Sequence, residues 1–160
     1  MGTTHIAAAA PDDYEWCARV MAGSEPWITL RRDLAECHAA LVRPGTELFV
    51  SRGLAARDLS SQDLPQPSGF ILVAPYGLAG SPYIASIAVA AEARRQGVGS
   101  ELLRFAERHF AGREHLFLLV SSFNLRAQQL YRRHGYQFVG ELKDYIVKGQ
   151  SELILYKRLP

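Results

Sequence analysis

The chain has 160 residues, of which 48% are hydrophobic and 21% charged, and its formal net charge is +2. This length fits one domain covering residues 1–160, and the composition excludes disordered, collagen-like and low-complexity proteins. The small net charge gives no case for a nucleic-acid partner. No apolar run approaches the roughly 20 residues needed to cross a bilayer, so no membrane partner is expected.

The cysteines and histidines favour a cytoplasmic protein without a metal. Cys17 and Cys37 are too few for a disulfide scaffold, and both fall in predicted helices. The five histidines show no zinc-type spacing to one another or to the cysteines. The N-terminal residues lack the basic segment of a signal peptide, so we expect a cytoplasmic location.

The hydrophobic pattern predicts an irregular alternation of strands and helices. In chain order we expect a strand at 3–8, helices at 11–21 and 29–42, and a strand at 47–51. A polar loop at 57–67 precedes a strand at 69–74, a glycine-containing turn at 76–82 and a strand at 83–90. A helix at 98–110 and a strand at 115–120 follow. Asn124 begins the last helix, Gly135 ends it, and strands are expected at 136–142 and 151–157.

This order, β-α-α-β-β-β-α-β-α-β-β, predicts the fold class. It indicates a single α/β (α+β) domain with a mixed central sheet of about seven strands and flanking helices. Several consecutive strands without a helix between them predict antiparallel neighbours within that sheet.

The segment 94–100, Arg-Arg-Gln-Gly-Val-Gly-Ser, has the composition of an anion-binding loop. It follows a predicted strand and begins a predicted helix, whose N-terminus carries a partial positive charge. Gly97 and Gly99 allow backbone amides to approach an anion closely, and Arg94 and Arg95 add full charges. A diphosphate suits this arrangement, and solvated arginines at a glycine-rich helix start are the alternative interpretation.

Two better-known phosphate motifs do not fit this segment. A Walker loop requires a Gly-Lys pair, which the chain lacks. A dinucleotide-binding fingerprint requires a third small residue where Leu102 stands.

Two motifs in the second half of the chain resemble those of a known family. Ile87-Ala88-Val89, followed by Arg94-x-x-Gly-x-Gly, is the first. The second has the form Asn-x-x-Ala-x-x-Leu-Tyr-x-x-x-Gly-Tyr and comprises Asn124, Ala127, Leu130, Tyr131, Gly135 and Tyr136. In this order and spacing they resemble the Gcn5-related N-acetyltransferase (GNAT) family. The resemblance covers roughly residues 83–159, and the first eighty residues match only in the order of their elements.

The resemblance implies acetyl-CoA as cosubstrate, bound where two parallel strands diverge near Val89 and Val120. The cofactor-binding residues that it implies are Ile87, Ala88, Val89, Arg94, Arg95, Gln96, Gly97, Val98, Gly99, Ser100 and Asn124. The strand would bind pantetheine through its backbone, the amides of 95–100 would bind the pyrophosphate, and Asn124 would bind the pantetheine arm. A simple N-cap role for Asn124 is compatible with that function.

The resemblance also implies that Tyr131 is the catalytic general acid. A phenol of pKa about 10 is close enough to a thiol of about 8.5 to protonate the departing thiolate. The alternative is an amphipathic tyrosine of the core.

No general base is evident in the sequence. Leu119 stands where relatives that acetylate the N-terminus of a ribosomal protein have a glutamate. The residues expected near the cleft that would order a water are Ser86, Ser121 and Ser122, and the carboxylates at which such a relay would end are Glu25, Glu36 and Asp144.

The acceptor pocket is expected between the loops at 23–29 and 143–151, with Trp27 and Tyr145 as substrate-binding residues. A hydrophobic contact at a helix start is the alternative for Trp27, and packing at an edge strand is the alternative for Tyr145.

The predicted function is acetyl-CoA-dependent transfer of an acetyl group to a primary amine of a small molecule or peptide. Direct attack in a ternary complex is expected, because no cysteine falls in the two motifs. The alternatives are a non-catalytic acyl-CoA-binding or sensing module of the same fold and a protein N-terminal acetyltransferase of the ribosomal-protein type. Whether the chain forms a homodimer is left open.

Overall fold

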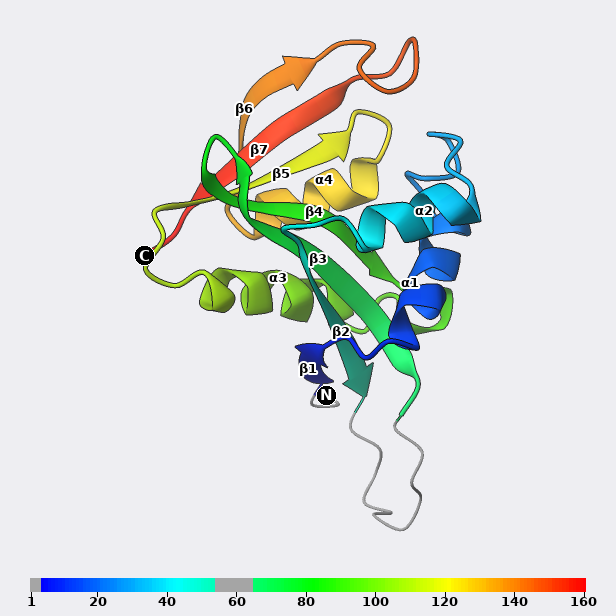
Figure 1. Cartoon of the computed structure of the whole chain (residues 1–160). Helices are drawn as coiled ribbons and strands as arrows, with labels where there is room; N and C mark the ends of the chain where they lie inside the picture. Colours follow the sequence, from blue (N-terminus) through cyan, green and yellow to red (C-terminus); the bar gives the residue numbers. More distant parts are fainter. Residues whose placement is uncertain (1–3, 54–64) are drawn as a thin grey trace.

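The computed structural model describes residues 4–53 and 65–160, and its elements follow the predicted order (Figure 1). They are β1 Thr4–Ala8, α1 Asp13–Ala22, α2 Leu34–Leu41, β2 Glu47–Gly53, β3 Pro67–Leu78, β4 Ser81–Val89, the 3-10 turn η1 Ala91–Ala93, α3 Val98–His109, β5 His115–Ser121, α4 Leu125–Arg133, β6 Gln137–Leu142 and β7 Glu152–Arg158. The strands form one sheet in the order β1-β2-β3-β4-β5-β7-β6. Neighbouring strands of this sheet are antiparallel except β4 and β5, which are parallel. The predicted fold class is confirmed.

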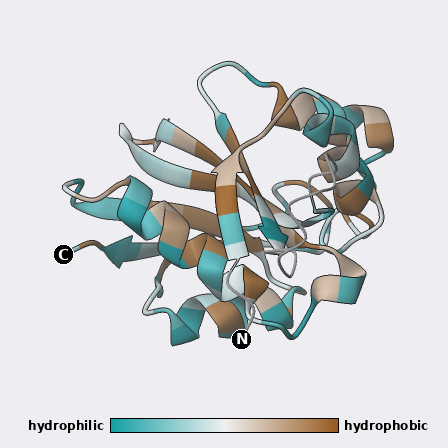
Figure 2. Ribbon diagram, turned by 90° about the horizontal axis from the view of Figure 1, so that it is seen from below, coloured by the Kyte–Doolittle hydropathy of each residue, from teal (hydrophilic) through white to brown (hydrophobic). Residues whose placement is uncertain are grey.

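Helices cover both faces of the sheet, because successive side chains of a strand point to opposite faces. On β3, Phe70 and Leu72 pack with α1 and α2, whereas Ile71 and Val73 pack with α3 and α4. The helix ribbons alternate between hydrophilic and hydrophobic residues, as helices with one buried face do (Figure 2). The sheet therefore separates two hydrophobic clusters.

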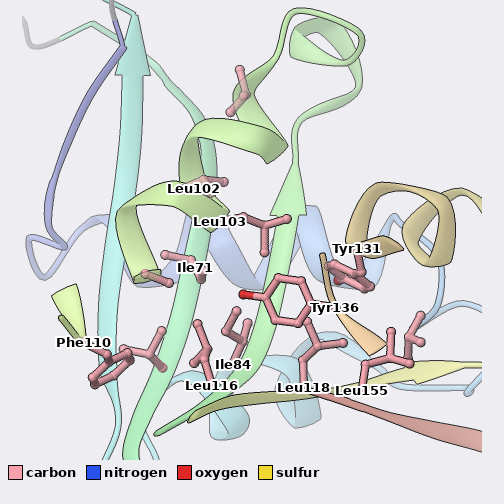
Figure 3. Close-up of a cluster of buried hydrophobic side chains, with 14 of the residues drawn as sticks. Ile71, Ile84, Leu102, Leu103, Phe110, Leu116, Leu118, Tyr131, Tyr136 and Leu155 are labelled. Carbon is pink, nitrogen blue, oxygen red and sulfur yellow. The ribbon is translucent and has the colours of Figure 1, made fainter. Parts of the chain in front are cut away.

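The cluster under α3 and α4 reaches the middle of the sheet. Leu102 and Leu103 of α3 are fully buried there, and Leu118 of β5 is 1% exposed. Tyr131 and Tyr136 lie beside these side chains (Figure 3). A tyrosine of α4 is thus brought to the place where β4 and β5 meet.

β4 and β5 are paired over only a short length. β4 pairs with β5 at Tyr83 and Ile84 and at no later described residue. Consecutive residues of β3 pair with Ile84 and Ser86, so Ala85 is an extra residue of β4, a β-bulge. A bulge bends its strand and increases the local twist. The divergence expected from the sequence is therefore present, and it begins at this bulge.

Helix α2 begins at Leu34, so the prediction of a helix from residue 29 was wrong at its start. Asp33 caps the helix, since its Oδ1 accepts from the Glu36 amide at 2.8 Å and Glu36 Oε2 accepts from the Asp33 amide at 3.0 Å. This reciprocal capping box fixes the first turn. The Asp-x-x-Glu pattern was visible in the sequence and marks the true start.

The turn between β3 and β4 is shorter than predicted. Both strands extend into 76–82, and the chain reverses at Ala79 and Gly80, which have φ angles of 49° and 76°. The register shifts between Ala74 and Leu78, and Leu78 then pairs with Ser81 beside this tight turn. The predicted loop at 57–67 lies outside the described residues up to position 64, and residue 3 of the first predicted strand also lies outside them.

Candidate active site

A cleft of about 880 Å³ opens where β4 and β5 diverge. Its walls come from the segment between α1 and α2, from α2, from β4 and β5, from the start of α4 and from the loop between β6 and β7. Of the predicted catalytic, cofactor-binding and substrate-binding residues, five line it, namely Trp27, Ile87, Asn124, Tyr131 and Tyr145. The structure thus brings both predicted acceptor residues to the same cleft as the predicted catalytic tyrosine.

The edge of β4 that faces the cleft has no strand partner beyond Ile84. Ile87 lines the cleft, and Ala88 is buried against α1 and α2. The Val89 carbonyl accepts a hydrogen bond from Arg94 Nε at 3.3 Å. An extended ligand can therefore pair with this edge as a strand does.

The start of α3 has the geometry of an anion site. Gly97 is its N-cap with φ of 84°, and Arg95 also has a positive φ, 63°. The first backbone hydrogen bond of the helix runs from the Glu101 amide to the Gly97 carbonyl at 3.0 Å. Among the described residues, the amides of 95–100 donate no hydrogen bond, so they are available to an anion at the positive end of the helix dipole.

The side chains of this loop hold it in place. Arg94 Nη2 donates to Ser24 Oγ at 3.3 Å, which ties the loop to the end of α1. Gln96 Nε2 donates to the Glu92 carbonyl at 3.0 Å, and Arg95 is exposed. The loop does not line the cleft itself. Arg94 borders a second cavity of about 330 Å³ between α1 and η1.

The first turn of α3 is packed against α4. A Cβ added to Gly99 would lie 3.2 Å from Leu130 Cδ2, so the glycine allows the two helices to approach closely. Ser100 Oγ lies 2.9 Å from His134 Nε2, and Val98 is 6% exposed in the core. These contacts fix the loop relative to the helix that carries Tyr131.

Asn124 is the N-cap of α4 and also lines the cleft. Its Oδ1 accepts from the Ala127 amide at 3.3 Å. No described residue accepts a hydrogen bond from its side-chain amide nitrogen, so that group can donate to a ligand. The capping and ligand-binding roles therefore use different atoms.

Tyr131 is 6% exposed and packs edge-on against Tyr136, with ring centroids 6.1 Å apart. Burial raises the pKa of Tyr131 well above that of an ordinary phenol, and the nearby Tyr83 adds to the effect. The phenol is therefore protonated over the whole neutral range. It is also a weaker acid than the ordinary phenol assumed from the sequence.

Glu152, which sequence reasoning missed, is a buried carboxylate of the cleft. It is 5% exposed and begins β7, opposite Ser121 of β5. Ser121 Oγ donates to Glu152 Oε1 at 2.7 Å. Burial raises the pKa of Glu152, and the hydrogen bond from Ser121 opposes this shift. No local motif marks this residue, because it reaches the cleft only when β7 lies beside β5.

The carboxylates named from the sequence are already engaged. Glu25 lines the cleft but accepts from Thr29 Oγ1 at 2.8 Å, and Glu36 belongs to the capping box. Asp144 Oδ1 accepts from the Gly149 amide at 2.6 Å, and Asp144 is not among the cleft-lining residues.

Cys37 also lines the cleft but is poorly suited to nucleophilic catalysis. Its side chain is 1% exposed, and burial raises its pKa, with Asp33 and Glu36 adding to the shift. A thiol with a raised pKa carries little thiolate, which is the reactive form.

Two further features bear on partners. Among the described residues, no group of three His, Cys, Asp or Glu side chains is arranged to hold a metal ion. None of the helices in that part of the chain has the length and apolar character needed to cross a bilayer.

Proteins with related sequences and structures are acetyltransferases. Over 76 residues the chain is 41% identical to "GCN5-related N-acetyltransferase 6, chloroplastic" of Arabidopsis thaliana, a match that covers 46% of this chain and 26% of that protein. The chain thus matches only about a quarter of that relative's length.

Solved structures show the same fold. NAA60 of Arabidopsis thaliana in complex with a bisubstrate analogue superposes with a TM-score of 0.76 at 15% identity, covering 99% of this chain and 100% of that one. An aminoglycoside 6'-N-acetyltransferase complexed with coenzyme A gives a TM-score of 0.72 at 15% identity, covering 98% of each chain. The model of the "Acetyltransferase (GNAT) family" matches residues 10–136, so this chain belongs to that family.

Proposed function

We propose that the protein is an acetyl-CoA-dependent N-acetyltransferase that acetylates a primary amine of a small molecule or peptide. The observation that carries this proposal is the cleft at the divergence of β4 and β5, which receives Tyr131 from α4. The structural relatives bound to a bisubstrate analogue and to coenzyme A support it.

The cleft and the separate loop at 94–100 together suit acetyl-CoA. The amides of 95–100 and the positive φ of Gly97 fit a diphosphate, and Arg94 and Arg95 contribute charge. The free edge of Ile87–Val89 and the Asn124 side-chain amide fit the amide groups of pantetheine. Acetyl-CoA bound there would supply the acetyl group and a thiolate leaving group.

The same cleft has room for the acceptor. Trp27 packs against the α1 and α2 cluster, while Tyr145 is 64% exposed on the loop between β6 and β7. Both form walls to which an amine can be held beside the thioester. Direct transfer is favoured over an acyl-enzyme because Cys37 is buried with a raised pKa.

Tyr131 would stabilise the departing sulfur. A buried donor aimed at a developing charge is worth more than one in water, since it needs little reorganisation. Because burial raises the pKa of Tyr131, complete transfer of its proton to a thiolate is uphill. We therefore assign Tyr131 a hydrogen bond to the sulfur that strengthens as the negative charge develops.

The test is release of free CoA thiol from acetyl-CoA with a panel of primary amines. For Tyr131→Phe we expect kcat to fall about 100-fold, the usual effect of removing one such donor. The Kd for acetyl-CoA, measured by calorimetry, should stay unchanged. Tyr136→Phe is the matched control, because Tyr136 is buried in the same cluster but does not line the cleft.

Two outcomes would contradict parts of this proposal. Tight binding of acetyl-CoA without thiol release in the presence of any amine would favour a non-catalytic acyl-CoA-binding module. Full activity of Tyr131→Phe would remove the role assigned to Tyr131 and leave the reaction itself standing.

A further inference from the structure

Glu152 approaches the cleft from the face of the sheet opposite to Tyr131. The pairing of β7 with β5 is uninterrupted from His115 to Ser121, so side chains of β7 alternate regularly between the faces. Leu155 packs in the cluster with α3 and α4, and Glu152, three residues earlier, points to the other face. A carboxylate and a phenol thus flank the divergence of β4 and β5.

The carboxylate of Glu152 has one partner and a free oxygen. Oε1 accepts from Ser121 Oγ at 2.7 Å, and no described residue donates a hydrogen bond to Oε2. Among the described residues, no Lys, Arg or His forms an ion pair with Glu152. A buried carboxylate without a cation is costly, so this site favours a positively charged guest.

A substrate ammonium is the cation that the cleft would bring to this oxygen. An amine with the pKa of about 8 to 10 enters mostly protonated at neutral pH and cannot attack until it loses a proton. Glu25 and Glu36 also line the cleft, but their carboxylates already accept hydrogen bonds from Thr29 and Asp33. Glu152 is the buried carboxylate left for this task.

We propose that Glu152 is the catalytic base that accepts the proton of the acceptor ammonium at Oε2. This role rests on the function proposed above. Once the proton is on Glu152, the nitrogen lone pair forms the C–N bond and the C–S bond breaks with its electron pair on sulfur. The nitrogen then loses its second proton, which the thiolate takes up, and Glu152 returns its own proton to solvent.

The surroundings of Glu152 make it a better base than an exposed glutamate. Burial raises its pKa toward that of the amine, and Ser121 limits the rise. The other ionisable side chains that line the cleft are Glu25, Arg32, Glu36, Cys37, Arg43, Tyr83, Tyr131 and Tyr145. Burial, with the charge of Glu152, raises the pKa of Tyr83 to about 12, so Tyr83 does not compete for the proton near neutrality.

The kinetic test compares Glu152→Gln with Glu141→Gln, an exposed glutamate on β6. We expect Glu152→Gln to lower kcat at least about 100-fold, as for loss of a general base, with an unchanged Kd for acetyl-CoA. Glutamine keeps the acceptor oxygen for Ser121, and retained acetyl-CoA binding shows that the variant is folded. Glu141→Gln should keep the wild-type rate.

Ser121→Ala tests the same role through pH. Removing the hydrogen bond that lowers the pKa of Glu152 should move the acidic limb of the kcat/KM profile to higher pH. A second readout needs no turnover. In carbon NMR of labelled glutamate carboxyls, the signal lost in Glu152→Gln should titrate above the ordinary glutamate range, and higher again in Ser121→Ala.

Each result decides between distinct conclusions. If the wild-type protein releases no thiol with any amine, the proposed function and this role both fall. If the wild type is active and Glu152→Gln keeps its kcat, only the role of Glu152 falls. A raised KM with unchanged kcat would show that Glu152 merely binds the ammonium, and an unmoved acidic limb in Ser121→Ala would also overturn the proton transfer.

Discussion

Gly97 and Gly112 share an unusual backbone conformation but stand in different surroundings. Their φ angles are 84° and 89°, and a Cβ added to either would meet no atom within 4 Å. Gly97 lies among the free amides at the start of α3, whereas Gly112 follows α3 at its other end. Comparing the same substitution at the two glycines therefore distinguishes the effect of backbone strain from an effect on ligand binding.

We expect Gly97→Ala and Gly112→Ala each to lower the free energy of unfolding by about 1 kcal/mol, the cost of a left-handed alanine. Only Gly97→Ala should weaken acetyl-CoA binding, by about tenfold or more, because its methyl group would stand where the anion approaches the amides. Chemical denaturation and calorimetry measure the two effects. Equal acetyl-CoA affinity in both variants would contradict a diphosphate site at this loop.

For single residues, the sequence predicted those site positions that a local motif marks. The spacing from Asn124 to Tyr131 placed both on one helix, and the structure sets both at the cleft. Glu152 escaped detection because its partner Ser121 is 31 positions away and meets it only through strand pairing. Arg94 contacts Ser24, 70 positions away, for which the sequence held no signal either.

Among the elements, β3 lies tightly against β4 at Gly69. A Cβ there would lie 2.8 Å from the Ala88 carbonyl oxygen, a backbone atom that cannot rotate aside. Gly140 on β6 is the matched glycine, since its added Cβ would lie at an ordinary 3.6 Å from Ile154 Cδ1. The contact at Gly69 thus sets the position of the strand that borders the cleft.

Gly69→Ala is expected to destabilise the protein by about 1–3 kcal/mol, the usual cost of overpacking. Gly140→Ala should stay within about 0.5 kcal/mol of wild type. Urea denaturation of both variants provides the comparison. Similar stabilities for the two variants would show that β3 and β4 can shift enough at Gly69 to accommodate a methyl group.

The elements themselves were predictable to different degrees. Strand alternation and the periodicity of α3 gave the right order, because each signal lies within one element. The start of α2 was misplaced, although the Asp33 and Glu36 capping box announces it. The bulge at Ala85 was beyond prediction, because it is a mismatch between two strands and not a property of either one.

For the whole molecule, the shared sheet predicts that both helical layers unfold together. β3 gives alternate side chains to each hydrophobic cluster, so neither layer can separate without exposing one face of the same strand. Trp27 packs in the α1 and α2 cluster, whereas Trp16, on α1, packs against both clusters.

We expect the thermal transition followed by tryptophan fluorescence to coincide with that followed by far-ultraviolet circular dichroism, to which all elements contribute. Coincidence would support a single domain over 1–160. An earlier fluorescence transition would show that the α1 and α2 layer melts on its own.

The short pairing of β4 with β5 also has a mechanical meaning. By its strand pairing the sheet has two parts, β1-β2-β3-β4 and β5-β7-β6. They are joined where Tyr83 and Ile84 of β4 pair with β5. No described residue of β4 beyond Ile84 pairs with β5. We expect a ligand that bonds to both β4 and β5 to hold the two parts of the sheet together, so that its binding also reduces the motion of β1 and β6, the outermost strands.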